Sequence, residues 1–165
     1  MRIRLIADGK IKDAALRALE ADYSARLRHF TELVIEETPP GRGAGAKSGT
    51  RSGQSGHSDR GSPSPAERRL LERVSGSTTI CLDAAGREWT SQQFAEWLGK
   101  QALSGMRELA FLVGGAEGFS AAFKQQADLV LALSRMTLTH DWARVLLLEQ
   151  IYRAFTILRG YPYAR

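Results

Sequence analysis

The chain has 165 residues, of which 43% are hydrophobic, and it carries a net charge of +5. Its length and apolar content predict one domain with its own core, and no apolar run approaches the roughly 20 residues that cross a bilayer. The lone Cys81 excludes an intrachain disulfide and a thiolate metal cluster, and His29, His57 and His140 lack metal-ligand spacing. We therefore expect a cytoplasmic protein without a membrane or a metal, and the positive charge favours a polyanionic partner such as RNA, although many basic proteins bind none.

The first third of the chain predicts a strand, a helix and a second strand. Residues 2–8 alternate apolar and polar side chains, which is a charged strand pattern and not a secretory signal. Asp13 is placed to cap the helix, and residues 31–37 form the second strand. The expected apolar stripe of the helix comprises Leu16, Leu19, Tyr23 and Leu27.

Residues 38–63 change in composition to Gly, Ser, Arg and Pro, with almost no large apolar side chain. Such a segment buries too little surface to offset its ordering entropy, so we predict a flexible basic Gly/Ser-rich loop. Its segment GRGAGAKSGT resembles a phosphate-binding loop, but Lys47 follows Ala46 where that motif requires glycine. We interpret the segment as a basic loop that either extends an RNA contact or is simply disordered.

Two capping-box patterns mark the next helices. Ser64 and Glu67 predict a helix that ends near Val74, and Thr90 and Gln93 predict another. The positions of this second helix that are expected to face inward are Phe94, Trp97 and Leu98.

Three short apolar runs predict buried strands at 77–83, 109–113 and 129–133, and the final helix is expected at about 140–158. Strands that alternate with helical segments predict an α/β fold, with a mainly parallel sheet and helices on both of its faces. We therefore expect a single α/β domain over residues 1–165.

The segment FLVGGAEGF joins a predicted strand to a helix that starts at Ser120. Gly114, Gly115 and Gly118 let bare backbone approach a ligand closely, and strand-to-helix turns often bind cofactors in α/β folds. Glycine pairs also end many ordinary strands, so plain turn chemistry is the alternative. The spacing does not reproduce GxGxxG, which argues against a dinucleotide enzyme.

Several blocks near and within the last third of the chain occur in a specific order: 79–83, 114–115, 117–118, 133–140, 144–146, 149–150, 152–154 and 161–163. In this order they closely resemble the α/β-knot, or SPOUT, methyltransferases. The likeness is strongest to the RlmH-type family, which methylates N3 of a pseudouridine in large-subunit (23S) ribosomal RNA. The resemblance covers nearly the whole chain.

The resemblance implies a deep trefoil knot in the C-terminal part, in which three loops surround S-adenosyl-L-methionine. Glycine turns expose amide and carbonyl groups to an adenine edge, and apolar side chains of the last loop supply walls. Ordinary core packing is the alternative for Leu133, Met136 and Leu138. The implied cofactor-binding residues are Leu82, Gly114, Gly115, Leu133, Ser134, Arg135, Met136, Thr137 and Leu138.

The resemblance also implies a homodimer in which each active site borrows residues from the neighbouring chain. Arg144 and Arg153 interrupt the apolar surface of the final helix, where they hold either RNA phosphate or a carboxylate such as Glu149. Arg159 and Arg165 are expected to follow RNA phosphates. The helix fits a dimer interface, or burial within one subunit, through Val145, Leu146, Leu148, Ile151, Tyr152, Phe155 and Leu158.

Methyl transfer from a sulfonium requires an acceptor nitrogen that is aligned with the methyl group and freed of its proton. The candidate catalytic residues are Glu117, His140 and Tyr163. Tyr163 is suited to stacking on the target base or hydrogen bonding to it, whereas a tail tyrosine in an arbitrary protein is simply packed or exposed.

Four positions depart from the pattern of the family. Ala116 and Thr139 stand where proline is usual, and Tyr161 and Ala164 stand where histidines flank the tail. Two hypotheses follow. The chain is an S-adenosylmethionine-dependent methyltransferase acting on a pseudouridine of ribosomal RNA, free or in the assembled ribosome, or it is a noncatalytic or altered-specificity RNA-binding or ribosome-binding factor that keeps the knot fold.

Overall fold

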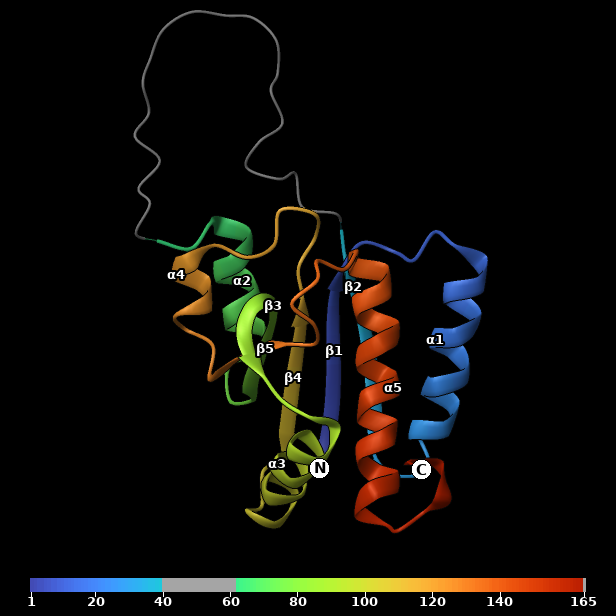
Figure 1. Ribbon diagram of the computed structural model, residues 1–165. Helices are drawn as coiled ribbons and strands as arrows, with labels where there is room; N and C mark the ends of the chain where they lie inside the picture. Colours follow the sequence, from blue (N-terminus) through green and yellow to red (C-terminus); the bar gives the residue numbers. More distant parts are fainter. Residues whose placement is uncertain (40–61, 165) are drawn as a thin grey trace, which may run out of the picture.

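A computed structural model describes residues 1–39 and 62–164, which form a five-stranded parallel sheet with helices on both faces (Figure 1). The strand order is β2-β1-β4-β3-β5, and every paired neighbour runs parallel. The predicted α/β class is therefore confirmed. Most of the predicted loop at 38–63, with Lys47 and His57, and also Arg165, lie outside the described residues.

The elements form where the hydrophobic patterns predict them, with most ends shifted by one or two residues. The strands are β1 (Arg2–Asp8), β2 (Glu32–Thr38), β3 (Thr78–Glu88), β4 (Glu108–Val113) and β5 (Leu129–Ala132). The helices are α1 (Ala14–Leu27), α2 (Pro65–Arg73), α3 (Ser91–Leu103), α4 (Ala121–Lys124) and α5 (His140–Leu158), followed by the 3-10 turn η1 (Pro162–Ala164). None of the helices in the described chain has the length and apolar content needed to span a membrane.

Local side-chain caps start the helices. The Asp13 carboxylate accepts hydrogen bonds from two backbone amides at the start of α1. Ser64 with Glu67, and Thr90 with Gln93, form reciprocal capping boxes at α2 and α3, as predicted. Because each cap satisfies amides that the first helical turn leaves without partners, these starts depend on neighbouring residues alone.

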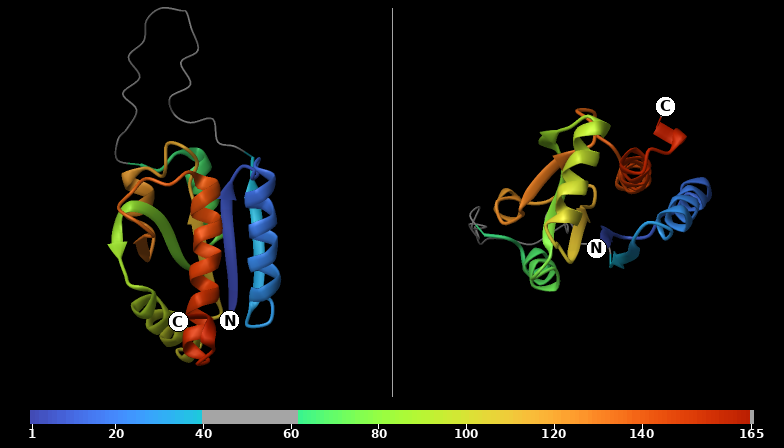
Figure 2. Two further views of the ribbon diagram at one scale, coloured as in Figure 1. Left: turned by 45° about the vertical axis from the view of Figure 1, so that its right-hand side comes forward. Right: turned by 90° about the horizontal axis from the view of Figure 1, so that it is seen from below.

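The two faces of the sheet carry separate cores. Leu5 of β1 packs with α1, α3 and α5, whereas the next residue, Ile6, packs with α2 and α4. Figure 2 shows α1 and α5 side by side on one side of the sheet, with α2 on the other. The prediction for Leu19 is wrong, because this side chain is 40% exposed. The buried face of α1 is centred on Leu16 and Leu27, and it turns the polar Glu20 inward instead.

Strand β3 is longer than the sequence predicts. Its register against β5 shifts between Leu82 and Arg87, after which β3 resumes pairing with β5. A Cβ atom at Gly86 would lie 2.8 Å from the β5 backbone, so this close crossing requires glycine. The expected end at Asp83 was therefore wrong. The small and polar residues that follow resemble a loop, and the renewed strand pairing at Arg87 and Glu88 depends on the distant strand β5.

Candidate functional site

Three connections leave the sheet at one edge. Because β4, β3 and β5 are adjacent and parallel, their carboxyl ends meet there, together with the turn after β4 and the loop that leads from β5 into α5 (Figure 1). Parallel sheets bind ligands outside the carboxyl ends of their strands. This edge therefore gathers the residues expected to hold the cofactor, and we call it the carboxyl edge.

The glycine turn after β4 is tightly packed. A Cβ atom at Gly114 would lie 3.2 Å from the backbone of Gly118 and 3.3 Å from the ring of Phe119, and one at Gly115 would collide with the Asp8 carboxylate. Gly118 has a positive φ of 66°, and its amide donates to the Gly115 carbonyl over 3.0 Å. Both predicted cofactor glycines therefore present bare backbone, and the space where a side chain would start is occupied by Gly118 and Phe119 at Gly114 and by Asp8 at Gly115.

One carboxylate anchors the end of this turn. The Glu67 side chain accepts hydrogen bonds from the backbone amides of Ser120 and Ser64, each over 2.7 Å, and from the Ser120 hydroxyl over 3.1 Å. Partial burial opposes ionisation, but these hydrogen bonds outweigh it and hold the pKa of Glu67 below its usual 4.5. Glu67 therefore joins the start of α2 to the start of α4.

Replacing Glu67 with glutamine should lower the melting temperature at neutral pH, because the new NH2 group faces backbone donors. Since the folded-state pKa of Glu67 is lowered, its stabilising contribution is present above the unfolded-state pKa and is lost as pH falls through the folded-state pKa. Thermal unfolding should therefore show a smaller difference from wild type at about pH 3 than at neutral pH. Glu72→Gln, at an exposed position of α2, is the control. A pH-independent difference would contradict this role.

The loop after β5 is largely exposed. The Ser134 hydroxyl accepts a hydrogen bond from the Met136 amide, and the Arg135 guanidinium donates to Glu88 at the end of β3 over 2.5 Å. Met136 is 77% exposed, so core packing does not account for it, whereas Leu133 packs against the main core. Of the other predicted cofactor contacts, Thr137 is exposed and Leu82, Ser134 and Leu138 are half-buried.

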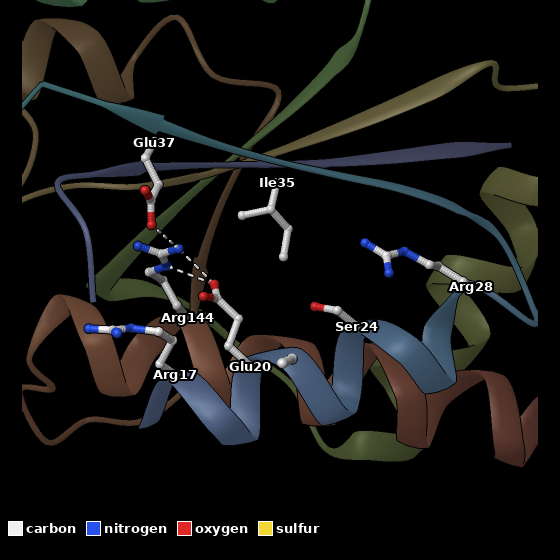
Figure 3. Close-up of a pocket in the computed structure, with 8 residues that line it drawn as sticks. Arg17, Glu20, Ser24, Arg28, Ile35, Glu37 and Arg144 are labelled. Atoms are coloured by element: carbon white, nitrogen blue, oxygen red, sulfur yellow. Dashed lines mark hydrogen bonds and ion pairs between the residues drawn. The ribbon is translucent and has the colours of Figure 1, made fainter. Parts of the chain in front are cut away.

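Two hollows of the described surface lie away from the carboxyl edge. One, of about 410 Å³, lies between α1 and β2 (Figure 3), and the other, of about 750 Å³, lies at the amino ends of the strands. Neither is lined by a residue predicted to bind the cofactor. The carboxyl edge is therefore identified by its strand topology and by its bare backbone.

Two of the three predicted catalytic residues belong to the carboxyl edge. Glu117 is exposed in the glycine turn, and His140 is the first residue of α5. The Nε2 atom of His140 lies 3.1 Å from Oδ1 of Asp141. Tyr163 lies elsewhere, because α5 runs away from this edge and the chain ends near the opposite end of the sheet (Figure 1).

Tyr163 belongs to a polar and aromatic cluster between α1 and α5. Its hydroxyl lies 3.2 Å from the Tyr23 hydroxyl and donates to Glu149 over 3.1 Å, and the Arg153 guanidinium lies over its ring. Burial, the hydrogen bond to Tyr23 and the charge of Glu149 raise the pKa of Tyr163. The phenol therefore stays protonated at neutral pH, and in this position it is a hydrogen-bond donor rather than a base.

Residues 1–164 match the family described as "Predicted SPOUT methyltransferase". The chain belongs to the SPOUT methyltransferase family. Proteins named "Ribosomal RNA large subunit methyltransferase H" from Geobacter metallireducens and Geobacter sulfurreducens are both 39% identical to it, each over 99% of this chain and 98% or 99% of their own length. The relative with the same name from Syntrophotalea carbinolica is 38% identical, over 99% of this chain and 98% of its own. The resemblance to RlmH-type proteins is thus confirmed.

The structure of a probable methylase family protein from Haemophilus influenzae Rd KW20 has a similar fold. Its TM-score is 0.51 at 15% identity, and the match covers 96% of this SPOUT chain and 67% of the other. At this identity the likeness concerns the fold alone. It agrees with the parallel α/β architecture, and the trefoil knot stays a prediction.

Arg144 of this SPOUT chain does not lie where an RNA phosphate would reach it. Its side chain is fully buried and donates to Glu20 over 2.7 and 3.1 Å, to Glu37 over 3.1 Å and to the Gly9 carbonyl over 3.0 Å. The intramolecular alternative therefore describes Arg144, although its partners are not Glu149. The sequence analysis did not predict Glu20 as the partner of Arg144. A carboxylate within the otherwise apolar stripe of α1 was the feature that could have indicated a buried cation.

The other predicted RNA-binding arginines differ in their surroundings. Arg153 pairs with Glu149 over 2.6 Å, which is the intramolecular alternative, and its side chain is still partly exposed. Arg159 caps the end of α5 and is exposed. Among the described residues, Arg159 is thus the predicted RNA contact whose side chain is most open to a phosphate.

Helix α5 is mostly covered by its own SPOUT chain. Of the seven positions proposed for an interface, Leu146 and Tyr152 are half-buried and Leu158 is exposed. Two apolar side chains that were not among the proposed interface positions, Met136 and Trp142, are exposed by 77% and 53%. The four proposed positions that are buried within the chain are Val145, Leu148, Ile151 and Phe155.

The buried thiol of Cys81 is chemically unreactive at neutral pH. Burial and the nearby charge of Asp83 raise the pKa of its thiol to about 12. The thiolate is the reactive form of cysteine, and the thiol predominates at neutral pH. Cys81 therefore serves as a core residue of β3, on the face of the sheet that α2 covers.

Proposed function

We propose that this chain is an S-adenosylmethionine-dependent methyltransferase that modifies N3 of a pseudouridine in large-subunit ribosomal RNA. The observation that carries the proposal is the near-complete alignment with relatives named as large-subunit ribosomal RNA methyltransferases, at up to 39% identity. The choice of pseudouridine N3 comes from the RlmH-type resemblance. The basic net charge of +5 agrees with a nucleic-acid substrate.

The carboxyl edge suits the cofactor. Gly114 and Gly115 have no side chains of their own to cover their backbone amides and carbonyls, and the half-buried Leu133 and Leu138 offer apolar contacts in addition to the exposed Met136. When bound, S-adenosylmethionine supplies an electrophilic methyl group. The task of the chain is then to orient the acceptor base and to accept its proton.

His140 and Glu117 are the residues proposed to accept that proton. Oδ1 of Asp141 lies 3.1 Å from Nε2 of His140 without forming a hydrogen bond, so both ring nitrogens of His140 are candidates to accept the proton. The exposed carboxylate of Glu117, in the glycine turn, is the alternative base.

A homodimer would complete the site. Within one chain the tail that carries Tyr163 lies far along α5 from the carboxyl edge (Figure 1). The exposed Met136 and Trp142, with the half-buried Leu146 on the Trp142 face of α5, form an apolar surface beside that edge. A second copy seated there would cover this surface and bring its own tail closer to the cofactor.

The direct test is transfer of a labelled methyl group. Purified protein, with S-adenosylmethionine, should label large ribosomal subunits taken from cells that lack the modification, and nucleoside mass spectrometry should identify 3-methylpseudouridine. Free ribosomal RNA tested in parallel identifies the preferred substrate. Absence of cofactor binding by calorimetry, together with absence of label on both substrates, would refute the proposal.

A noncatalytic RNA-binding or ribosome-binding factor is the second candidate. It is favoured by Tyr161 and Ala164, which replace the tail histidines usual in the family. Restoring both, as Tyr161→His with Ala164→His, should raise the methylation rate by roughly 100-fold if the present tail limits proton transfer. Tyr161→Phe is the matched control. A restored variant that binds ribosomes but transfers no methyl would favour the noncatalytic candidate.

A further inference from the structure

The hollow between α1 and the edge strand β2 has a regular lining. Arg17, Ala21, Ser24 and Arg28 follow one another at three- and four-residue spacing, so they form one stripe of α1 facing β2 (Figure 3). Ile35 of β2 lies opposite them. The two small side chains in the middle leave a space of about 410 Å³ between arginines placed at its two ends.

Positive charge is unpaired at both ends of this hollow. The Arg28 guanidinium makes no ion pair or side-chain hydrogen bond within residues 1–39 and 62–164, and Arg17 donates only to two backbone carbonyls, over 3.1 and 3.3 Å. In the middle, Glu20 and Glu37 both bind the buried Arg144. The three arginines and two glutamates that line the hollow therefore carry a net charge of +1, and the unpaired cations lie at its two ends.

The hydroxyl of Ser24 points to a missing ligand. Ser24 is 5% exposed, and its Oγ atom has no hydrogen-bond partner among the described residues. Figure 3 shows this oxygen facing the space between α1 and β2, midway between the two arginines. Buried hydroxyls normally find a partner, so this hydroxyl is available to bond a polar group that enters the hollow.

We propose that this hollow is an RNA groove, in which Arg17 and Arg28 each hold a backbone phosphate and Ser24 bonds to the ribose between them. The proposal rests on RNA being the substrate. The Cα atoms of the two arginines lie about 16 Å apart along the helix axis, which suits phosphates that are not adjacent. Between them, the carboxylates repel phosphate and accept hydrogen bonds from ribose hydroxyls, which sets the register of a single strand.

The test measures binding of a short fluorescent single-stranded oligoribonucleotide to the full chain by anisotropy over a range of salt. Arg17→Gln with Arg28→Gln should weaken binding roughly tenfold and reduce the slope of log K against log salt by about 1.4. The matched control is Arg69→Gln with Arg107→Gln, two exposed arginines outside the hollow. Equal affinities and slopes for the two double variants would overturn the groove.

Ser24→Ala separates a ligand contact from a structural role. Removing a buried hydroxyl that has no partner should raise the melting temperature slightly, while RNA binding weakens about threefold. A structural serine would give the opposite change in stability. Unchanged RNA affinity of Ser24→Ala would remove the ribose contact from the proposal.

Competition and activity separate the remaining outcomes. Inorganic pyrophosphate or polyglutamate that displaces the oligonucleotide at equal charge concentration would overturn the assignment to RNA, in favour of a small-anion or acidic-protein site. If wild type methylates ribosomal RNA but the Arg17 and Arg28 variant matches its control, the groove is wrong and the proposed function stands. If wild type binds the oligonucleotide through these arginines without methyl transfer, the groove stands and the enzymatic proposal fails.

Discussion

Replacing Gly114 with valine should weaken S-adenosylmethionine binding at least about 100-fold, which corresponds to ~2.8 kcal/mol, while the chain stays folded. Even a single Cβ at this position would lie 3.2 Å from the Gly118 backbone, and the two further methyl groups of valine would distort the turn that is proposed to hold the cofactor. Because backbone cannot move aside as a side chain does, the turn must shift or the ligand must withdraw.

Gly99→Val is the matched control for this variant. A Cβ at Gly99 would approach a methyl of Leu158 to 2.9 Å, which is also tight, but the neighbour is the end of a flexible side chain far from the carboxyl edge. Calorimetric titration with S-adenosylmethionine and circular dichroism should therefore separate the two variants. Wild-type affinity in a folded Gly114→Val protein would show that the cofactor binds elsewhere.

Replacing Arg144 with alanine should destabilise the chain by about 3–5 kcal/mol. The change leaves Glu20 and Glu37 without their shared cation and the Gly9 carbonyl without its donor, at a site where the guanidinium is fully buried. A loss of this size is a large share of the 5–15 kcal/mol that typically holds a folded protein together. Urea unfolding monitored by circular dichroism measures it.

Two comparison variants test whether burial of the charges causes this loss of stability. Arg153→Ala removes a partly exposed pair with Glu149 four residues away, so it should cost only about 1 kcal/mol. Combining Arg144→Met with Glu20→Gln and Glu37→Gln also removes the two carboxylate charges, so it should recover part of the lost stability. A stable Arg144→Ala protein that loses only RNA affinity would instead support the phosphate role first predicted for this residue.

The family of this protein was predictable from its order of short blocks. Each block, such as the glycine turn or the closing tyrosines, is weak by itself, but their sequence along the chain is specific, and the match over residues 1–164 confirmed it. The two residues Gly114 and Gly115 also identified the carboxyl edge, because a strand, a turn and a helix in succession already imply where the turn lies in a parallel sheet.

Other parts of the candidate site were not predictable in the same way. The sequence left Arg144 open between an RNA phosphate and a carboxylate, and it offered Tyr163 as a contact for the base; both side chains are engaged within the chain. Apart from the nearby Glu149, their side-chain partners are Glu20, Glu37 and Tyr23, which come from α1 and β2, more than a hundred residues earlier. A positive or phenolic side chain in the last helix or tail has the same local pattern whether it faces solvent, a partner or its own core.

The sequence by itself determined the helix starts, the bounds of α5 and the class of the sheet, because caps and hydrophobic periods act between residues a few positions apart. The family came from the resemblance of its ordered blocks. Tertiary structure alone decided the extension of β3 beyond Asp83, the burial of Arg144 and the hollow beside Ser24. Each of these depends on two segments that are distant along the chain meeting in a particular register. The free energy of such a contact belongs to the packed pair, and neither segment carries it alone.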